Sequence, residues 1–98
     1  MDEKQIQLFE ALRMIKDQWV DVSLIKLESG IEKLNLQEQQ NEIIESVIYS
    51  IMEMIDGYND NLNFRLDLID KDTKESVKGR VELHDKFIEY LEEIENRN

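Results

Sequence analysis

The residues of most obvious chemical interest are His84 and the aspartate that follows it, Asp85, because an imidazole beside a carboxylate can move protons or bind a metal ion. His84 is the one histidine of the chain. Neighbouring residues of a helix point about 100° apart, so these two side chains do not form a catalytic dyad, and one imidazole cannot supply a two-histidine metal site. We therefore expect His84 to lie partly buried, or at the surface near a helix start, without a catalytic role or a cofactor.

Two pairs of acidic residues have a spacing suited to magnesium. Glu42 with Glu45, and Glu53 with Asp56, resemble the E-x-x-E and E-x-x-D pairs with which all-α nucleotide pyrophosphohydrolases hold magnesium. The resemblance implies a magnesium-dependent hydrolase. On one continuous helix, however, Glu45 and Glu53 are about 12 Å apart along the axis and about 80° apart around it, so the four carboxylates do not share one ion. We therefore expect no enzyme.

A calcium loop is the other metal site that the spacing suggests. Asp70 and Asp72 occupy the first and third positions of an EF-hand loop, but Glu75 stands where glycine is needed, and Val81 stands where the bidentate glutamate belongs. The sequence around the serines is unlike a nucleophile elbow, and a chain with 3 glycines has no glycine-rich phosphate loop. We expect a solvated turn around Asp70.

Negative charge is concentrated in the middle of the chain. Residues 34–64 contain no Lys or Arg, in a chain of formal net charge −11. A field of this sign repels nucleic acid and anionic membranes and attracts basic proteins. On a helix, one stripe opposite the apolar face is expected to carry Glu38, Glu42, Glu45, Tyr49, Glu53 and Asp56. We predict that this stripe binds a partner, with Tyr49 as an aromatic anchor; a solvated face with some internal ion pairs is the alternative.

The composition indicates a folded and mostly helical chain. Of 98 residues, 41% are hydrophobic and 36% are charged, and none is proline, which suits a single domain over 1–98. The absence of cysteine suits a reducing compartment, so we expect a cytoplasmic protein. The most apolar window, 43–55, is shorter than a membrane span and contains two glutamates, so no membrane segment is expected.

Apolar residues spaced three and four apart predict the first and last helices. The stripe from Leu8 to Ile25 predicts a helix over about 3–28, although the alternation near its end also suits an extended segment. The corresponding stripe near the C-terminus predicts a helix over about 83–95.

Start and stop signals define a second helix, over about 36–56. Asn35 with Glu38 is the pattern of a capping box, and Gly57 is placed to end the helix. The apolar face of this helix is wide enough to contact two neighbours. We therefore expect the central helix of the fold, or half of a dimer interface.

The segment between the second and third helices has two interpretations. Alternating apolar and charged residues predict a β-hairpin with strands over about 63–69 and 76–82, in a register that sets Leu66 opposite Val81 and pairs opposite charges. The rival is a helix that begins near residue 72. We favour the hairpin and thus an α+β fold, predominantly helical, with a long helix, a central helix, the hairpin and a C-terminal helix. An all-α helical bundle is the alternative.

Small size, acidity and the lack of an enzyme motif predict a binding protein. We expect a non-enzymatic protein that binds and inhibits or neutralises a basic partner through the acidic face of helix 36–56, as immunity proteins, antitoxins and phage-encoded inhibitors do. The expected partner is a basic protein such as a nucleic-acid-acting enzyme or a toxin, with no direct contact to nucleic acid or membrane. The alternative is a helical homodimer with a structural or adaptor function, because the apolar face of the second helix is wide.

Overall fold

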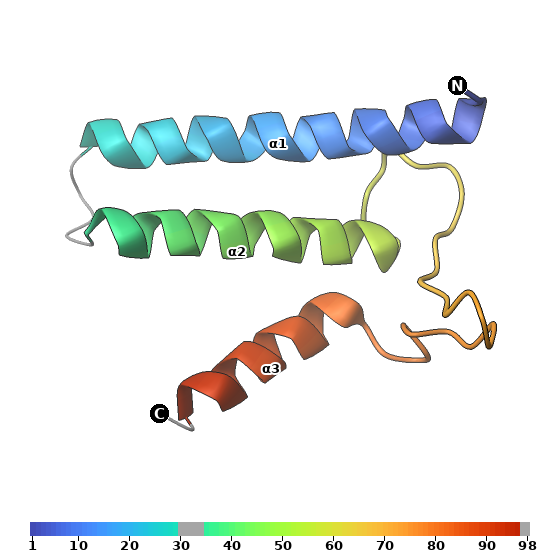
Figure 1. The fold of residues 1–98 in the computed structure, drawn as a ribbon. Helices are drawn as coiled ribbons and strands as arrows, with labels where there is room; N and C mark the ends of the chain where they lie inside the picture. Colours follow the sequence, from blue (N-terminus) through green and yellow to red (C-terminus); the bar gives the residue numbers. More distant parts are fainter. Residues whose placement is uncertain (30–34, 97–98) are drawn as a thin grey trace.

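The computed structural model describes residues 1–29 and 35–96, and its regular elements are three α-helices (Figure 1). They are α1 (Glu3–Ser29), α2 (Leu36–Ile55) and α3 (Leu83–Asn96). α1 and α2 lie side by side and antiparallel, and α3 lies obliquely on the other side of α2 (Figure 1). The helix that packs against both others is α2, which is therefore central. None of the described helices has the length and apolar content that crossing a membrane requires.

Local sequence signals define both ends of α2. The Asn35 side chain accepts a hydrogen bond from the Glu38 N–H at 2.9 Å, and the Glu38 carboxylate accepts one from the Asn35 N–H at 3.3 Å, so the predicted capping box is confirmed. At the other end, the N–H groups of Gly57 and Tyr58 donate to carbonyls of the last turn at 3.2 and 3.0 Å. Gly57 has a φ of +99°, which a residue without a Cβ adopts at low cost.

The core lies between the N-terminal half of α1 and the C-terminal half of α2. Ala11 and Ile15 of α1 are buried against Met54 of α2. Partly buried apolar residues surround these three: Leu8, Leu12, Trp19, Val47, Ile51, Ile55, Leu62 and Leu66. Because the last two come from the segment after α2, that segment closes the end of the helix pair.

The predicted hairpin over 63–69 and 76–82 is wrong, and the predicted α+β fold class is wrong with it. The described part of the chain contains three helices and no strand, so the protein is an all-α helical bundle. One isolated antiparallel bridge joins Ile69 to Ser76 across an exposed turn. In this turn the Asp70 carboxylate accepts hydrogen bonds from the next backbone N–H groups, the first of them at 2.9 Å.

Packing explains why the strands do not form. Leu66, which the predicted register set opposite Val81, packs against the α1–α2 core instead. Leu83 begins α3, so the returning segment ends at a helix start. A two-stranded hairpin alone is only marginally stable in water, and Leu66 gains more by covering the core than by pairing with an exposed valine.

The molecule is open for its size. Its radius of gyration is 16.0 Å and its extents are 45 × 36 × 19 Å, whereas a compact chain of 100 residues has a radius of about 13 Å. Its accessible surface is 7868 Å², against about 5,900 Å² for a typical monomer of this mass. Roughly 2,000 Å² of additional surface is exposed, and large apolar side chains contribute to it.

Candidate functional site

The N-terminal half of the predicted binding stripe lies partly against α1. Glu38 is exposed and belongs to the capping box. The Glu42 carboxylate forms an ion pair with the Lys26 ammonium of α1 at 2.7 Å. Glu45 accepts a hydrogen bond from the Asn41 side chain at 3.3 Å. This half of the stripe therefore combines one exposed and two half-buried carboxylates with one ion pair to a neighbouring helix.

The C-terminal half of the stripe is covered by α3. The Tyr49 ring meets the His84 imidazole edge to face, with ring centroids 5.4 Å apart. Glu53 is partly buried, and the Asp56 side chain is 0% exposed. The stripe is therefore not a uniform solvated face, because α3 packs on a part of α2 that the amphipathic pattern assigned to solvent.

A groove of about 290 Å³ opens where α1, α2 and α3 meet. Its described lining residues are Gln18, Trp19, Glu42, Glu45, Ser46, Tyr49, Ser50, Glu53 and Ile88, and none of them is basic. Three carboxylates beside aromatic and apolar side chains suit a lysine or arginine side chain. Its charged end can pair with a carboxylate while its alkyl stem lies along an aromatic ring. We call this site the acidic groove.

The other side of the α1–α2 contact is apolar. A second groove, of about 250 Å³, is lined by Lys16, Trp19, Val20, Ser23, Leu24, Ile43 and Val47. By helical spacing, Leu27 of α1 and Ile44 of α2 fall on the same side as these residues, and each is more than half exposed. Successive helical residues point about 100° apart, so Ile43 lies on this side while Glu42 faces the acidic groove. The apolar face is defined as Val20, Leu24, Leu27, Ile43, Ile44 and Val47.

Trp19 separates the acidic groove from the apolar face, because its side chain lines both grooves. The indole N–H donates to the Ser50 hydroxyl at 2.8 Å, which fixes the ring between α1 and α2. Trp19 is the one tryptophan of the chain. Its fluorescence therefore reports on both surfaces.

Asp56 joins α2 to α3. It is the C-cap residue of α2, and its carboxylate accepts hydrogen bonds from the Leu83 and His84 N–H groups at 3.0 and 2.9 Å. These are the first amides of α3, so Asp56 caps a helix that is distant in sequence. Nδ1 of His84 lies 2.6 Å from the same carboxylate, and the Lys78 ammonium lies 3.5 Å from it. We call this arrangement the Asp56 joint.

The charges of the joint stabilise one another. Burial disfavours the ionised Asp56 carboxyl, but hydrogen bonds from the α3 amides and His84, with the charge of Lys78, outweigh burial and lower the pKa of Asp56. Burial also disfavours the His84 imidazolium, but Asp56, Asp85 and Glu82 outweigh it and raise the pKa of His84. The joint therefore favours an imidazolium–carboxylate pair.

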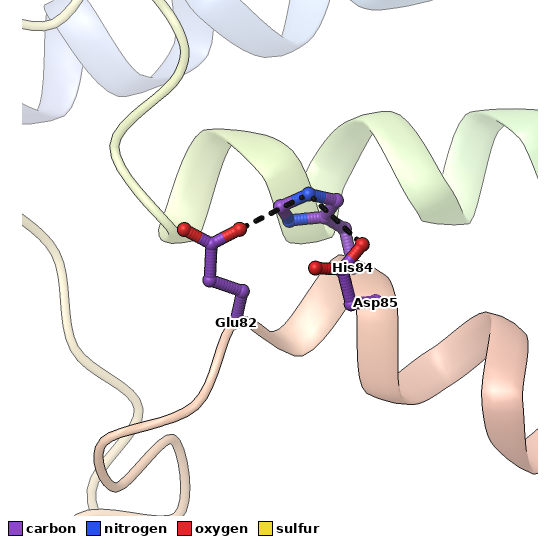
Figure 2. A group of neighbouring side chains, drawn as sticks. All are labelled: Glu82, His84 and Asp85. Carbon is purple, nitrogen blue, oxygen red and sulfur yellow. Dashed lines mark ion pairs between the residues drawn. The ribbon is translucent and has the colours of Figure 1, made fainter.

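Possible metal ligands gather at the start of α3 (Figure 2). Ligand atoms of Glu82, His84 and Asp85 all lie within 4.8 Å of one another. The sequence analysis considered the last two but missed Glu82, as well as the contact of His84 with Asp56. The short spacing of Glu82, His84 and Asp85 was a visible signal, whereas the contact with Asp56 comes from the tertiary structure.

The two acidic pairs that resemble a magnesium site lie along one helix. α2 is continuous over Leu36–Ile55, Glu42 pairs with α1, and Asp56 is enclosed by α3.

Comparisons of the chain with protein-family models, with curated proteins and with solved structures find no match. The acidic groove, the apolar face and the Asp56 joint are therefore the features of this molecule that bear on its function.

Proposed function

We propose that this protein is a non-enzymatic binding protein that takes a basic segment of another protein into the acidic groove and so inhibits or neutralises that partner. The observation that carries this proposal is a groove with three glutamates and no basic residue among its described lining residues. The lack of cysteine suits a reducing compartment, so the partner is expected in the cytoplasm.

The groove suits a partner segment with two or more Lys or Arg side chains. Glu45 and Glu53 lie on one side of α2 about 12 Å apart along its axis, so two cationic groups can each reach a carboxylate. Trp19 supplies an aromatic face for an alkyl stem or a guanidinium group. The net charge of −11 accelerates encounter with a positive surface, and this acceleration falls as salt is added.

The test reverses charge inside and outside the groove. Glu42 already pairs with Lys26, so we choose Glu45→Lys with Glu53→Lys. The matched control is Asp21→Lys with Glu93→Lys, which changes the net charge equally at exposed positions outside the groove. Tagged proteins are incubated with host lysate, and each retained protein is then purified and its affinity is measured by calorimetry.

The groove proposal predicts one basic protein that the wild type and the control bind alike and that the groove variant binds at least about tenfold more weakly. If the control loses as much affinity as the groove variant, net charge rather than the groove accounts for retention, and the proposal is wrong. The proposal also fails if no basic protein is retained at low salt.

The openness of the fold favours a second candidate, a homodimer that buries the part of the apolar face that α1 contributes. A stable interface covers about 1,200–2,000 Å² in total, or about 600–1,000 Å² on each partner, and the excess exposed surface of this one chain is larger than that share. Residues at alternating steps of four and three run along the exposed side of α1: Ile6, Glu10, Arg13, Asp17, Val20, Leu24 and Leu27. Two copies of α1 paired antiparallel about residue 15 would set Ile6 beside Leu24, and Arg13 beside Asp17, of the other copy.

Sedimentation equilibrium tests this candidate. Leu24→Glu places a charge on the apolar face, and Ile25→Glu places the same charge about 100° away on α1, at a residue that is also exposed. A homodimer through the apolar face predicts that Leu24→Glu is monomeric while Ile25→Glu remains dimeric. A wild type that is monomeric at micromolar concentration would exclude it.

A further inference from the structure

We propose that Glu82, His84 and Asp85 bind a divalent metal ion of zinc type at the start of α3. Figure 2 shows the imidazole of His84 between the two carboxylates. Nε2 of His84 lies 3.4 Å from a Glu82 oxygen and 3.5 Å from an Asp85 oxygen. This site is separate from the acidic groove, since none of its three residues lines that groove.

The distances from Nε2 of His84 to the two carboxylate oxygens suit an ion between them, and all three ligand atoms lie within 4.8 Å of one another. Zinc–nitrogen and zinc–oxygen bonds of about 2.0–2.1 Å at tetrahedral angles put neighbouring ligand atoms about 3.3–3.4 Å apart. A direct charge-assisted hydrogen bond is shorter, at about 2.7–2.9 Å. The two distances from His84 Nε2 match ligands that share an ion more closely than they match hydrogen bonds.

The orientation of His84 is an independent observation that points to a ligand. Its side chain is 10% exposed, and its Nδ1 lies 2.6 Å from the Asp56 carboxylate, which is fully enclosed. A carboxylate that accepts the Nδ1–H of a histidine fixes the tautomer whose Nε2 lone pair can bind metal, a common outer partner of metal-binding histidines. The rings of Tyr49 and Tyr58 hold the imidazole edge-on, at centroid distances of 5.4 and 5.3 Å.

The Glu82 carboxylate is also held in a fixed orientation. The Tyr58 hydroxyl donates to one of its carboxylate oxygens, and the other oxygen is the one that faces His84. Such a second hydrogen bond orients a carboxylate ligand. Water completes the coordination, because Glu82 and Asp85 are 44% and 70% exposed.

Local charge also favours a dication. With His84 neutral, the three carboxylates of Asp56, Glu82 and Asp85 carry three negative charges, and among the described residues the Lys78 ammonium pairs with Asp56. A bound divalent ion would neutralise the two excess negative charges. A proton on His84 would neutralise only one of them. The ion and the proton compete for Nε2, so metal binding releases a proton and weakens as the pH falls.

Calorimetric titration of the protein with zinc chloride is the first test, with cobalt chloride as a spectroscopic probe of tetrahedral coordination. The chain has 1 His and 0 Cys, so a histidine signal that shifts on metal binding belongs to His84. We expect one equivalent bound and a raised melting temperature, since a ligand of the folded state stabilises it. Glu82→Gln and Asp85→Asn should each weaken binding by about tenfold or more.

The control is Glu92→Gln with Glu93→Gln, which removes two exposed acidic charges from the same helix outside the cluster. This control should bind zinc as the wild type does. An equal loss in the control and in Asp85→Asn would mean diffuse attraction of cations to an acidic protein and would overturn the site. Titration without saturation at one equivalent would overturn it as well. Neither outcome bears on the acidic groove, because no partner protein is present.

Discussion

The same two helices present opposite chemistry on their two sides. In the acidic groove α2 presents Glu42, Glu45 and Glu53, whereas on the apolar face it presents Ile43 and Val47. Residues adjacent in sequence thus reach surfaces of different kind, because a helix turns about 100° per residue. On the acidic side α3 contributes Ile88 to the groove.

This difference separates two ways of binding. Charges attract a partner from a distance, set its orientation and are screened by salt. Exposed apolar side chains act only on contact, and they stabilise a complex in proportion to the area removed from water. A protein with both surfaces can bind a basic partner on one side while its other side is covered, so each surface can be altered separately.

The largest effect is expected for Asp56→Ala, which removes the carboxylate that holds α3 on the acidic side. Two α3 amides, His84 and Lys78 lose their partner, and we expect about 3 kcal/mol less stability in urea unfolding. Asp56→Asn keeps an acceptor and should lose less. Asp21→Ala, at an exposed position, is the control; equal stability of the two alanine variants would refute the joint.

The next largest effect is expected from salt, which should weaken binding at the acidic groove but not at the apolar face. Raising NaCl from 0.1 to 1 M shortens the screening length from about 10 to about 3 Å. We expect a peptide with several lysines to bind the acidic groove at least about tenfold more weakly at the higher salt. Association through the apolar face should be unchanged or stronger, since burial of apolar area is not screened. Trp19 fluorescence and sedimentation measure the two, and a parallel loss of both would contradict the distinction.

A smaller effect is expected from Ser50→Ala, which alters the surroundings of Trp19 between the acidic groove and the apolar face. It leaves the Trp19 indole N–H without its hydrogen bond, for an expected loss of about 1 kcal/mol in unfolding free energy. The change should also shift the tryptophan emission. Ser23→Ala, beside Trp19 on the apolar side, is the matched control and should cost less than about 0.5 kcal/mol. Indistinguishable stabilities would show that the Trp19–Ser50 bond contributes nothing.

The smallest effect is expected from pH. The folded pKa of His84 is raised above 6.5, so its contribution to stability is complete below that pH and is lost as the pH rises through the folded value. The folded pKa of Asp56 is lowered below 3.8, so its contribution is present above that pH and is lost as the pH falls through the folded value. Melting temperatures should therefore decline above pH 6.5 in the wild type but not in His84→Gln. The same decline in both proteins would exclude His84 as its source.

Sequence reasoning placed the helices well, because their signals are local. α1 and α3 lie within a residue of the expected spans, and the capping box at Asn35 sets the start of α2. The predicted hairpin was wrong because alternation and charge pairing show only that a strand register is possible. They do not show whether that register is more stable than other packings of the same segment. Leu66 had a better contact in the core.

Sequence by itself determined the three helices, the end signals of α2, the negative charge and the two chemically different sides of α2, because each depends on residues within a few positions of one another. Only the tertiary structure decided that α3 covers the end of the acidic stripe, that Asp56 caps α3, and that the imidazole of His84 lies between an enclosed carboxylate and two exposed ones. These features join groups far apart in the chain. Whether these contacts form depends on the burial and hydrogen bonding of the whole fold, which the spacing of residues along the sequence does not reveal.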